Sequence, residues 1–230
     1  MSSLTPRPGL ISTPTTHLSQ RMLSLALTLG VGVLRCPRPR YQLPTDIALR
    51  ALSLAPGQCL YLHGPSGAGK TTTLNAIASL LRRRGRSVQW LRPLPRSTRA
   101  VIELLDGDIT QALAAACDVG LSEAPLLLRP ATALSQGESW RLRLAIAMQR
   151  CKQNQSQLPP FLLADGWCEQ LDDHTATCVS TAFSRWSIRR GVCLIAASTK
   201  PAATLLPGAI PIAVTPESFR HGFPASPLVR

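Results

Sequence analysis

The stretch that most constrains this chain is the segment 64–72, which reads GPSGAGKTT. It fits the pattern G-x-x-x-x-G-K-[ST], in which glycines let backbone N–H groups turn inward around phosphate oxygens. Lys70 supplies a positive charge for the β- and γ-phosphates of a nucleotide, and the Thr71 hydroxyl can ligate Mg²⁺. The residues expected to contact the phosphates are Gly64, Pro65, Ser66, Gly67, Ala68, Gly69, Lys70, Thr71 and Thr72.

The sequence on both sides of this segment favours a nucleotide site over a plain glycine-rich turn. Residues 58–63 form a short apolar run that predicts a buried strand. Residues 72–81 place Leu74, Ile77 and Leu81 on one helical face. The helix that follows the glycines therefore directs the positive end of its dipole at the bound anion.

The remainder of the chain alternates between strand-like and helix-like segments. Asp108 can cap a helix, and Ser135 can begin another. We expect helices over 108–116, 138–150 and 174–190, and strands over 86–91, 161–165 and 191–197, with one more candidate strand at 210–214. This alternation predicts an α/β fold with a mostly parallel sheet and helices on both faces.

The two ends of the chain differ from the middle. Residues 1–20 are rich in Ser, Thr and Pro and lack acidic residues, which predicts a disordered tail. Leu and Val alternate with small residues over 23–33, which predicts a strand. Six prolines follow from Pro201 onward, so little regular structure is expected over 201–230. The foldable domain is therefore predicted to span residues 21–200.

The chain is strongly basic, with a net charge of +13 over 230 residues. A basic surface favours an anionic partner such as a nucleotide or nucleic acid, although it can also be a plain soluble surface. Seven arginines and no acid lie between 82 and 99, namely Arg82, Arg83, Arg84, Arg86, Arg92, Arg96 and Arg99. The seven cysteines are scattered without a C-x-x-C pair, which indicates reduced thiols in the cytosol and no zinc site.

Two further motifs carry possible chemistry. The segment 134–138 reads LSQGE and precedes a helix, so Ser135 and Gly137 can either cap that helix or clamp a second phosphate with it. The apolar strand 161–165 ends at Asp165. A carboxylate at the end of a strand beside a phosphate loop can hold Mg²⁺ through its water shell.

These three motifs, in this order, resemble the ATP-binding-cassette (ABC) ATPases, a class of P-loop NTPases. The resemblance covers residues 41–199 and includes Leu171-Asp172, which fits the family's loop at its dimer interface. Tyr41 lies 23 residues before Gly64, where the family has an aromatic ring that stacks on adenine. A single tyrosine is equally compatible with a surface ring on an edge strand.

The resemblance implies a cofactor, an assembly and a fold. The cofactors would be ATP and Mg²⁺. Two chains would pack head to tail as a homo- or heterodimer, so that Ser135 and Gly137 of one chain close over the ATP of the other. The implied fold includes a small antiparallel β region and a helical subdomain. Because only 64 residues separate Lys70 from Ser135, that subdomain is expected to be shortened, and Gln89 is expected to lie within a strand.

The departures from the family pattern concern hydrolysis. Gly166 occupies the position of the glutamate that polarises the attacking water, and Thr199 occupies the position of the switch histidine. A positioned base contributes typically about 10²–10⁴-fold to a rate. We therefore expect an ATP-binding protein that dimerises on Mg–ATP and hydrolyses it weakly or not at all.

Three alternatives remain open at this stage. The chain can be an active ATPase whose water is held by Glu169 or by a partner. It can be the ATP-binding subunit of a membrane transporter, although the shortened middle argues against this. It can also be a nucleic-acid-associated ATPase that uses the seven arginines. The short middle segment and the Trp-Cys pair after Gly166 most resemble a soluble, cytoplasmic ABC subgroup, some members of which are joined to an acetyltransferase-like domain.

Overall fold

The computed structural model describes residues 10–13, 19–29, 32–35, 43–94, 96–153, 158–200 and 205–215. The chain divides into two compact units, Met1–Tyr41 and Gln42–Arg230. Tyr41, the predicted adenine-stacking residue, lies outside the described residues.

The described residues of the N-terminal unit form one helix and a two-stranded sheet. Helix α1 spans Gln20–Thr28, and strands β1 (Leu10–Thr13) and β2 (Gly32–Arg35) pair in parallel. The prediction of a strand over 23–33 is therefore wrong. The Ser19 side chain accepts a hydrogen bond from the Met22 N–H (3.3 Å) and caps the helix. Leucine also favours helix, so this cap and propensity outweigh the alternating pattern. Strand β1 lies within the stretch that was expected to be disordered.

The larger unit is built on a five-stranded parallel sheet with the order β4-β5-β6-β3-β7. Its strands are β3 (Cys59–His63), β4 (Val88–Trp90), β5 (Phe161–Asp165), β6 (Cys193–Ser198) and β7 (Ile210–Ala213). The predicted parallel sheet and its five strands are confirmed. Among the described residues the antiparallel pairing is limited to an isolated bridge between Ala100 and Pro130, so the expected antiparallel β region is not found there.

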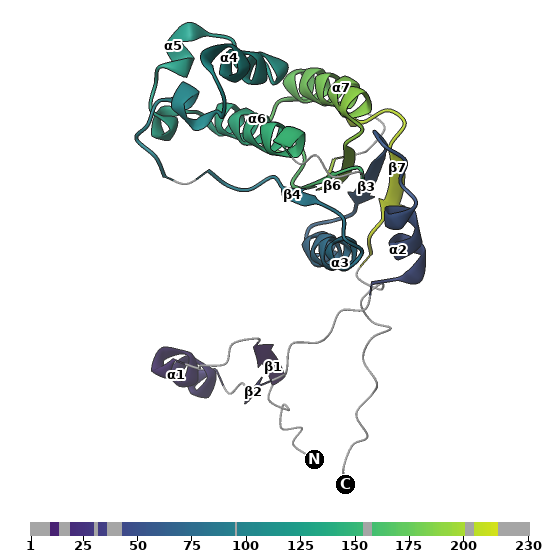
Figure 1. Cartoon of the computed structure of the whole chain (residues 1–230). Coiled ribbons are helices and arrows are strands. Elements are labelled where there is room, and N and C mark those ends of the chain that lie inside the picture. The colour runs from purple at the N-terminus through teal and green to yellow at the C-terminus, as the bar shows by residue number, and fades with distance from the viewer. Residues whose placement is uncertain are drawn as a thin grey trace, which may run out of the picture. The chain divides into compact units, whose positions relative to one another are not determined.

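Helices cover both faces of this sheet, as predicted (Figure 1). On one face lie α2 (Thr45–Leu52) and α3 (Lys70–Arg83). On the other lie α4 (Ile109–Asp118), α5 (Ala124–Leu127), α6 (Gln136–Gln153) and α7 (Asp173–Arg190), with the short 3₁₀ turns Val101–Leu104 and Ala131–Ala133. Asp108 caps α4 by accepting a hydrogen bond from the Gln111 N–H (2.8 Å), as its sequence position predicts.

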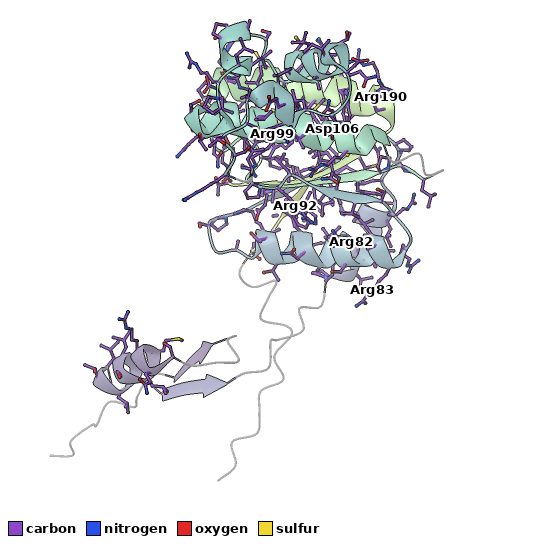
Figure 2. The ribbon with its side chains drawn as sticks, turned by 60° about the vertical axis from the view of Figure 1, so that its left-hand side comes forward. Arg82, Arg83, Arg92, Arg99, Asp106 and Arg190 are labelled. Carbon is purple, nitrogen blue, oxygen red and sulfur yellow. The ribbon has the colours of Figure 1, made fainter. Side chains whose placement is uncertain are left out.

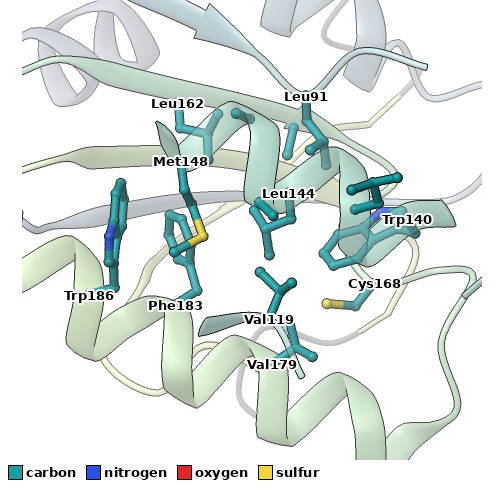
Figure 3. Packing of buried hydrophobic residues seen from close by; sticks show 14 of the residues in the cluster. Leu91, Val119, Trp140, Leu144, Met148, Leu162, Cys168, Val179, Phe183 and Trp186 are labelled. Carbon is teal, nitrogen blue, oxygen red and sulfur yellow. The ribbon is translucent and has the colours of Figure 1, made fainter. Parts of the chain in front are cut away.

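The alternation of side chains along the strands produces two hydrophobic cores. Leu60 and Leu62 of β3 pack with α2 and α3, whereas Cys59 and Tyr61 face α6 and α7. Aromatic rings fill the second core, including Trp140, Phe183 and Trp186 (Figure 3). None of the described helices combines the length and hydrophobicity needed to cross a lipid bilayer. Because all five strands run in parallel, their carboxyl ends meet at one edge, and the candidate site lies there.

Candidate nucleotide-binding site

The phosphate-binding loop connects the end of β3 to the start of α3. Gly67 and Gly69 adopt left-handed conformations, with φ of 78° and 89°. A side chain at Gly64 would overlap the carbonyl oxygen of Val214, which follows β7. The Ala68 N–H donates to the Pro65 carbonyl (3.2 Å) and closes the turn. The three glycines are thus needed for two reasons, backbone conformation and close approach of a neighbouring chain segment.

The Lys70 side chain folds back across this loop. Its ammonium group donates to the carbonyl oxygens of Gly64 (2.8 Å) and Pro65 (2.9 Å). The positive charge therefore lies within the turn that leads into α3, where an anion would enter. This concentration of donors is the arrangement that recognises phosphate oxygens.

Thr71 and Asp165 meet at the edge of the sheet, although they are distant in sequence. The Thr71 hydroxyl donates to Asp165 Oδ2 (2.7 Å), and both residues are exposed. The described residues contain no group of three or more His, Cys, Asp or Glu side chains that could hold a metal unaided. Mg²⁺ suits such a site, because it is usually held by one or two protein oxygens together with substrate phosphates and water. The residues present therefore fit a phosphate-bound Mg²⁺ ion.

Ser135 and Gly137 lie at the N-terminus of α6. Ser135 Oγ accepts a hydrogen bond from the Glu138 N–H (3.2 Å), and Glu138 Oε2 accepts one from the Ser135 N–H (2.7 Å). These reciprocal bonds form a capping box, and the bonds from the Ser135 backbone and hydroxyl lower the pKa of Glu138. A Cβ on Gly137 would lie 3.3 Å from the Leu171 side chain. Within one chain, the Ser135 hydroxyl thus serves the helix cap, and action on a second chain's nucleotide stays a prediction.

The residues at the two departures from the family pattern lie next to the same carboxylate. Glu169 Oε1 accepts hydrogen bonds from the Thr199 N–H (2.7 Å), the Thr199 hydroxyl (3.1 Å) and the Ser198 hydroxyl (3.0 Å). Its other oxygen, Oε2, lies 3.3 Å from the position that a Cβ on Gly166 would take. Because 30 positions separate Glu169 from Thr199, this contact could not be predicted from local sequence patterns.

A cavity of about 460 Å³ opens beside Asp165. It is lined by Asn75, Trp90, Leu91, Arg92, Pro93, Arg143 and Asp165. The half-buried Arg143 fixes one wall, because its guanidinium donates to the backbone carbonyls of Arg92 (2.8 Å) and Leu91 (3.3 Å). Burial lowers the pKa of Arg143. The sequence predicted the helix over 138–150 but did not identify Arg143 as part of the site.

Gln89 does not line this cavity. It lies within β4, as expected, and its amide donates to the carbonyl of the adjacent Trp90 (3.2 Å). The polar side chains that line the cavity with Asp165 therefore include Arg92, which follows β4, and Arg143, which lies on α6.

The seven arginines between 82 and 99 do not gather on one face. Arg82 and Arg83 lie on α3, whereas Arg92 lies near the edge of the sheet and Arg99 beside the helical layer on its other face (Figure 2). Arg99 also pairs with Glu103 (3.5 Å), which reduces its availability to an anion. The alternative of a nucleic-acid-binding patch formed by these arginines finds no support in this distribution.

Known proteins resemble different parts of this chain. Residues 50–107 match the family model described as ABC transporter. The zinc import ATP-binding protein ZnuC of Pseudomonas fluorescens is 37% identical over an alignment of 116 positions, which covers 43% of this chain and 43% of that relative. The match thus spans less than half the length of the curated relative.

The likeness in fold extends further than the likeness in sequence. A bacterial ABC transporter cassette solved as a dimer superposes with a TM-score of 0.51 and 20% identity, over 70% of this chain and 82% of that chain. The ADP conformation of an ATP-binding cassette of an ABC transporter gives a TM-score of 0.53 at 14% identity, over 70% of this chain and 78% of that one. Proteins with this fold bind ATP together with Mg²⁺. The chain is therefore a P-loop protein with the fold of the ATP-binding-cassette ATPases.

Proposed function

We propose that this chain binds Mg–ATP and works as the ATP-binding module of an ABC-type assembly. The observation that carries the proposal is the hydrogen bond between Thr71 and Asp165 at the mouth of the phosphate loop. It brings the two side chains that suit Mg²⁺ together at the end of the loop whose turn holds the ammonium group of Lys70. The loop residues 64–72 would contact the phosphates, with Lys70 between the β- and γ-phosphates.

We further propose that the assembly is a dimer closed by ATP. Ser135 and Gly137 stand at a helix N-terminus that can contribute donors to the phosphates of a second chain. The Leu171 side chain lies beside this helix start, and the Asp172 side chain caps α7. The dimeric cassette among the structural relatives supports this arrangement.

The process served is most consistent with transport. The curated relatives are zinc import ATP-binding proteins, and the family model is that of ABC transporters. We therefore favour the ATP-binding subunit of a membrane transporter, positioned on the cytoplasmic side, over a binding protein that does not hydrolyse ATP. The resemblance to the soluble subgroup stays a prediction, and these relatives do not support it.

Nucleotide binding is tested by the substitution Lys70→Ala. Isothermal titration with Mg–ATP should show binding to the wild type and a loss of at least about 100-fold for the variant, because a charge-assisted contact with phosphate is removed. Arg83→Ala is the matched control, since it removes an exposed positive charge at the other end of the same helix. Unchanged binding by Lys70→Ala would place the nucleotide elsewhere.

Transport is tested by fractionating source cells that carry the tagged chain at its native level. A transporter subunit should sediment with membranes and be retained there by an integral membrane protein after detergent extraction. A chain recovered entirely from the supernatant would favour the soluble alternative. Light scattering with and without Mg–ATP separately reports whether ATP closes a dimer.

A further inference from the structure

We propose that Glu169 is the general base for ATP hydrolysis in this chain, and that Thr199 positions it. The inference rests on the proposed binding of Mg–ATP. It reverses the expectation from sequence, in which Gly166 and Thr199 mark the loss of the hydrolytic groups. The central observation is that both of these residues lie against the Glu169 carboxylate.

The backbone after β5 folds back so that the Glu169 carboxylate lies beside Gly166. Gly166 has a φ of 72°, and Cys168 has a φ of 55°, the one positive value for a non-glycine residue in the described chain. The Glu169 N–H donates to the Gly166 carbonyl (3.3 Å), which closes the turn. A left-handed conformation costs a residue with a side chain about 1–2 kcal/mol, so the turn is held by contacts elsewhere.

Trp167 and Cys168, which lie between Gly166 and Glu169, restrain the turn through their buried contacts. The Trp167 N–H donates to the Ala197 carbonyl (2.9 Å), and its indole N–H donates to the Ser180 hydroxyl (3.0 Å). Trp167 and Cys168 are both fully buried, and Cys168 packs in the second hydrophobic core, which contains Trp140 (Figure 3). Glu169 itself is exposed. The turn therefore combines a fixed backbone with a carboxylate that can reach solvent or substrate.

The two carboxylate oxygens of Glu169 have different surroundings. Oε1 is held by three donors from Ser198 and Thr199. Oε2 has no hydrogen-bond partner among the described residues, and it lies beside the empty space at Gly166. A side chain at residue 166 would occupy this space. Gly166 thus leaves room for the free oxygen, and Thr199 holds the other one in place.

The position of this oxygen suits a base. Asp165 pairs with Ala197 in the sheet, so the ends of β5 and β6 are adjacent, and Glu169 spans them. The Asp165 carboxylate contacts Thr71, at the start of α3. Glu169 Oε2 therefore lies beside Gly166, the residue that directly follows the side chain expected to face the metal ion and the γ-phosphate.

The reaction balances with groups already named. Water attacks the γ-phosphorus while Glu169 Oε2 accepts one of its protons. A bond forms between the water oxygen and phosphorus, and the bond from phosphorus to the bridging oxygen breaks. ADP leaves with that electron pair, and the proton passes from Glu169 to the released phosphate or to solvent.

The test compares Glu169→Gln with Glu123→Gln, which makes the same change at an exposed glutamate whose side chain does not cap its helix. Single-turnover hydrolysis at saturating Mg–ATP should fall about 10²–10⁴-fold in Glu169→Gln and remain unchanged in Glu123→Gln. Mg–ATP affinity, measured by titration, should change less than about threefold, since the phosphate loop is intact.

A second readout does not depend on rate. Light scattering should show that Glu169→Gln remains dimeric in Mg–ATP for hours, whereas the wild type returns to monomer as ATP is consumed. Equal turnover by wild type and Glu169→Gln would overturn the inference, as would a wild type that binds Mg–ATP without hydrolysing it. A wild type that does not bind Mg–ATP would instead refute the proposed function.

Thr199→Val covers the case in which Glu169→Gln does not fold. It removes the hydroxyl donor to Oε1 but keeps the carboxylate and the Thr199 N–H. If Thr199 positions the base, this substitution should lower the hydrolysis rate, while the affinity for Mg–ATP and the unfolding midpoint stay close to wild type. A rate equal to wild type would contradict the role of Thr199 and, with it, the proposed placement of the base.

Discussion

The phosphate-binding loop and the turn after β5 are both tight segments at the carboxyl edge of one sheet, but they are held in different ways. The loop is restrained mainly by residues within itself, through the bonds of Lys70 to Gly64 and Pro65. The turn is restrained by distant residues, through Ala197, Ser180 and Thr199. One segment is defined locally, and the other depends on the assembled core.

This difference determines what each segment can tolerate. The loop is largely exposed, so substitutions there act on backbone conformation and on phosphate binding. The turn buries Trp167 and Cys168 and exposes Glu169, so the same kinds of substitution act through the core or through a single carboxylate. Substitutions of glycine in the two segments test this contrast directly.

The largest effect is expected from Gly64→Ala. The added methyl group would overlap the Val214 carbonyl oxygen, which belongs to the backbone and cannot rotate away. We expect a loss of about 1–3 kcal/mol in the free energy of unfolding, together with loss of Mg–ATP binding. Urea titration measures the first and calorimetric titration the second.

Gly67→Ala is the control for this prediction, because a methyl group there has no neighbour within 4 Å and adds only the strain of φ 78°. It should cost less than Gly64→Ala. Equal losses in the two variants would mean that conformation, and not the approach of the residue after β7, accounts for the requirement at Gly64.

A smaller effect is expected from Gly166→Glu in the turn. Its φ of 72° makes any side chain cost about 1–2 kcal/mol, and the new Cβ would lie 3.3 Å from Glu169 Oε2. Although this substitution restores the glutamate of the family pattern, we expect no gain in ATP turnover, because the new side chain would displace the Glu169 carboxylate that already lies beside this position. Steady-state hydrolysis and urea unfolding provide the two measurements.

Gly166→Ala separates strain from charge, since it adds the Cβ without a second carboxylate. It should lose stability to a similar degree as Gly166→Glu. A marked rise in turnover for Gly166→Glu would argue that the wild type lacks a base and that Glu169 serves only to join the ends of β5 and β6.

The same contrast explains which parts of the molecule could be predicted from its sequence. The phosphate loop, the Asp108 cap and the position of Asp165 depend on neighbours in the chain, and all three occur where the sequence places them. The contact of Glu169 with Thr199 joins residues 30 positions apart, and that of Arg143 with Arg92 spans 51. No local pattern contains such contacts.

Helix α1 shows the opposite failure, in which a local pattern supports the wrong structure. Alternating leucines are typical of a strand, but over nine residues they are also compatible with a helix. The hydrogen bond from Met22 to Ser19 decides between the two, and a serine at this position is a signal that sequence reasoning can use.

The smallest effect is expected at the start of α6, which packs against the turn through Gly137 and Leu171. Glu138→Ala removes half of the capping box, so we expect a loss of less than about 1 kcal/mol in unfolding free energy at neutral pH. The hydrogen bonds from Ser135 lower the folded-state pKa of Glu138 below its ordinary value of 4.5. A lowered folded-state pKa stabilises the protein above the unfolded-state value and ceases to do so as pH falls through the folded-state value.

The difference in stability between wild type and Glu138→Ala should therefore be constant above about pH 5 and shrink below pH 4.5. Urea unfolding of both proteins across this range measures it, and subtraction removes the titration of the other carboxylates they share. A difference that stays constant to acidic pH would mean that Glu138 stabilises α6 by packing or helix propensity instead of by its charge. In that case the first turn of α6 would be restrained mainly by its contact with Leu171. It would then resemble the turn after β5, which is also restrained by residues distant in sequence.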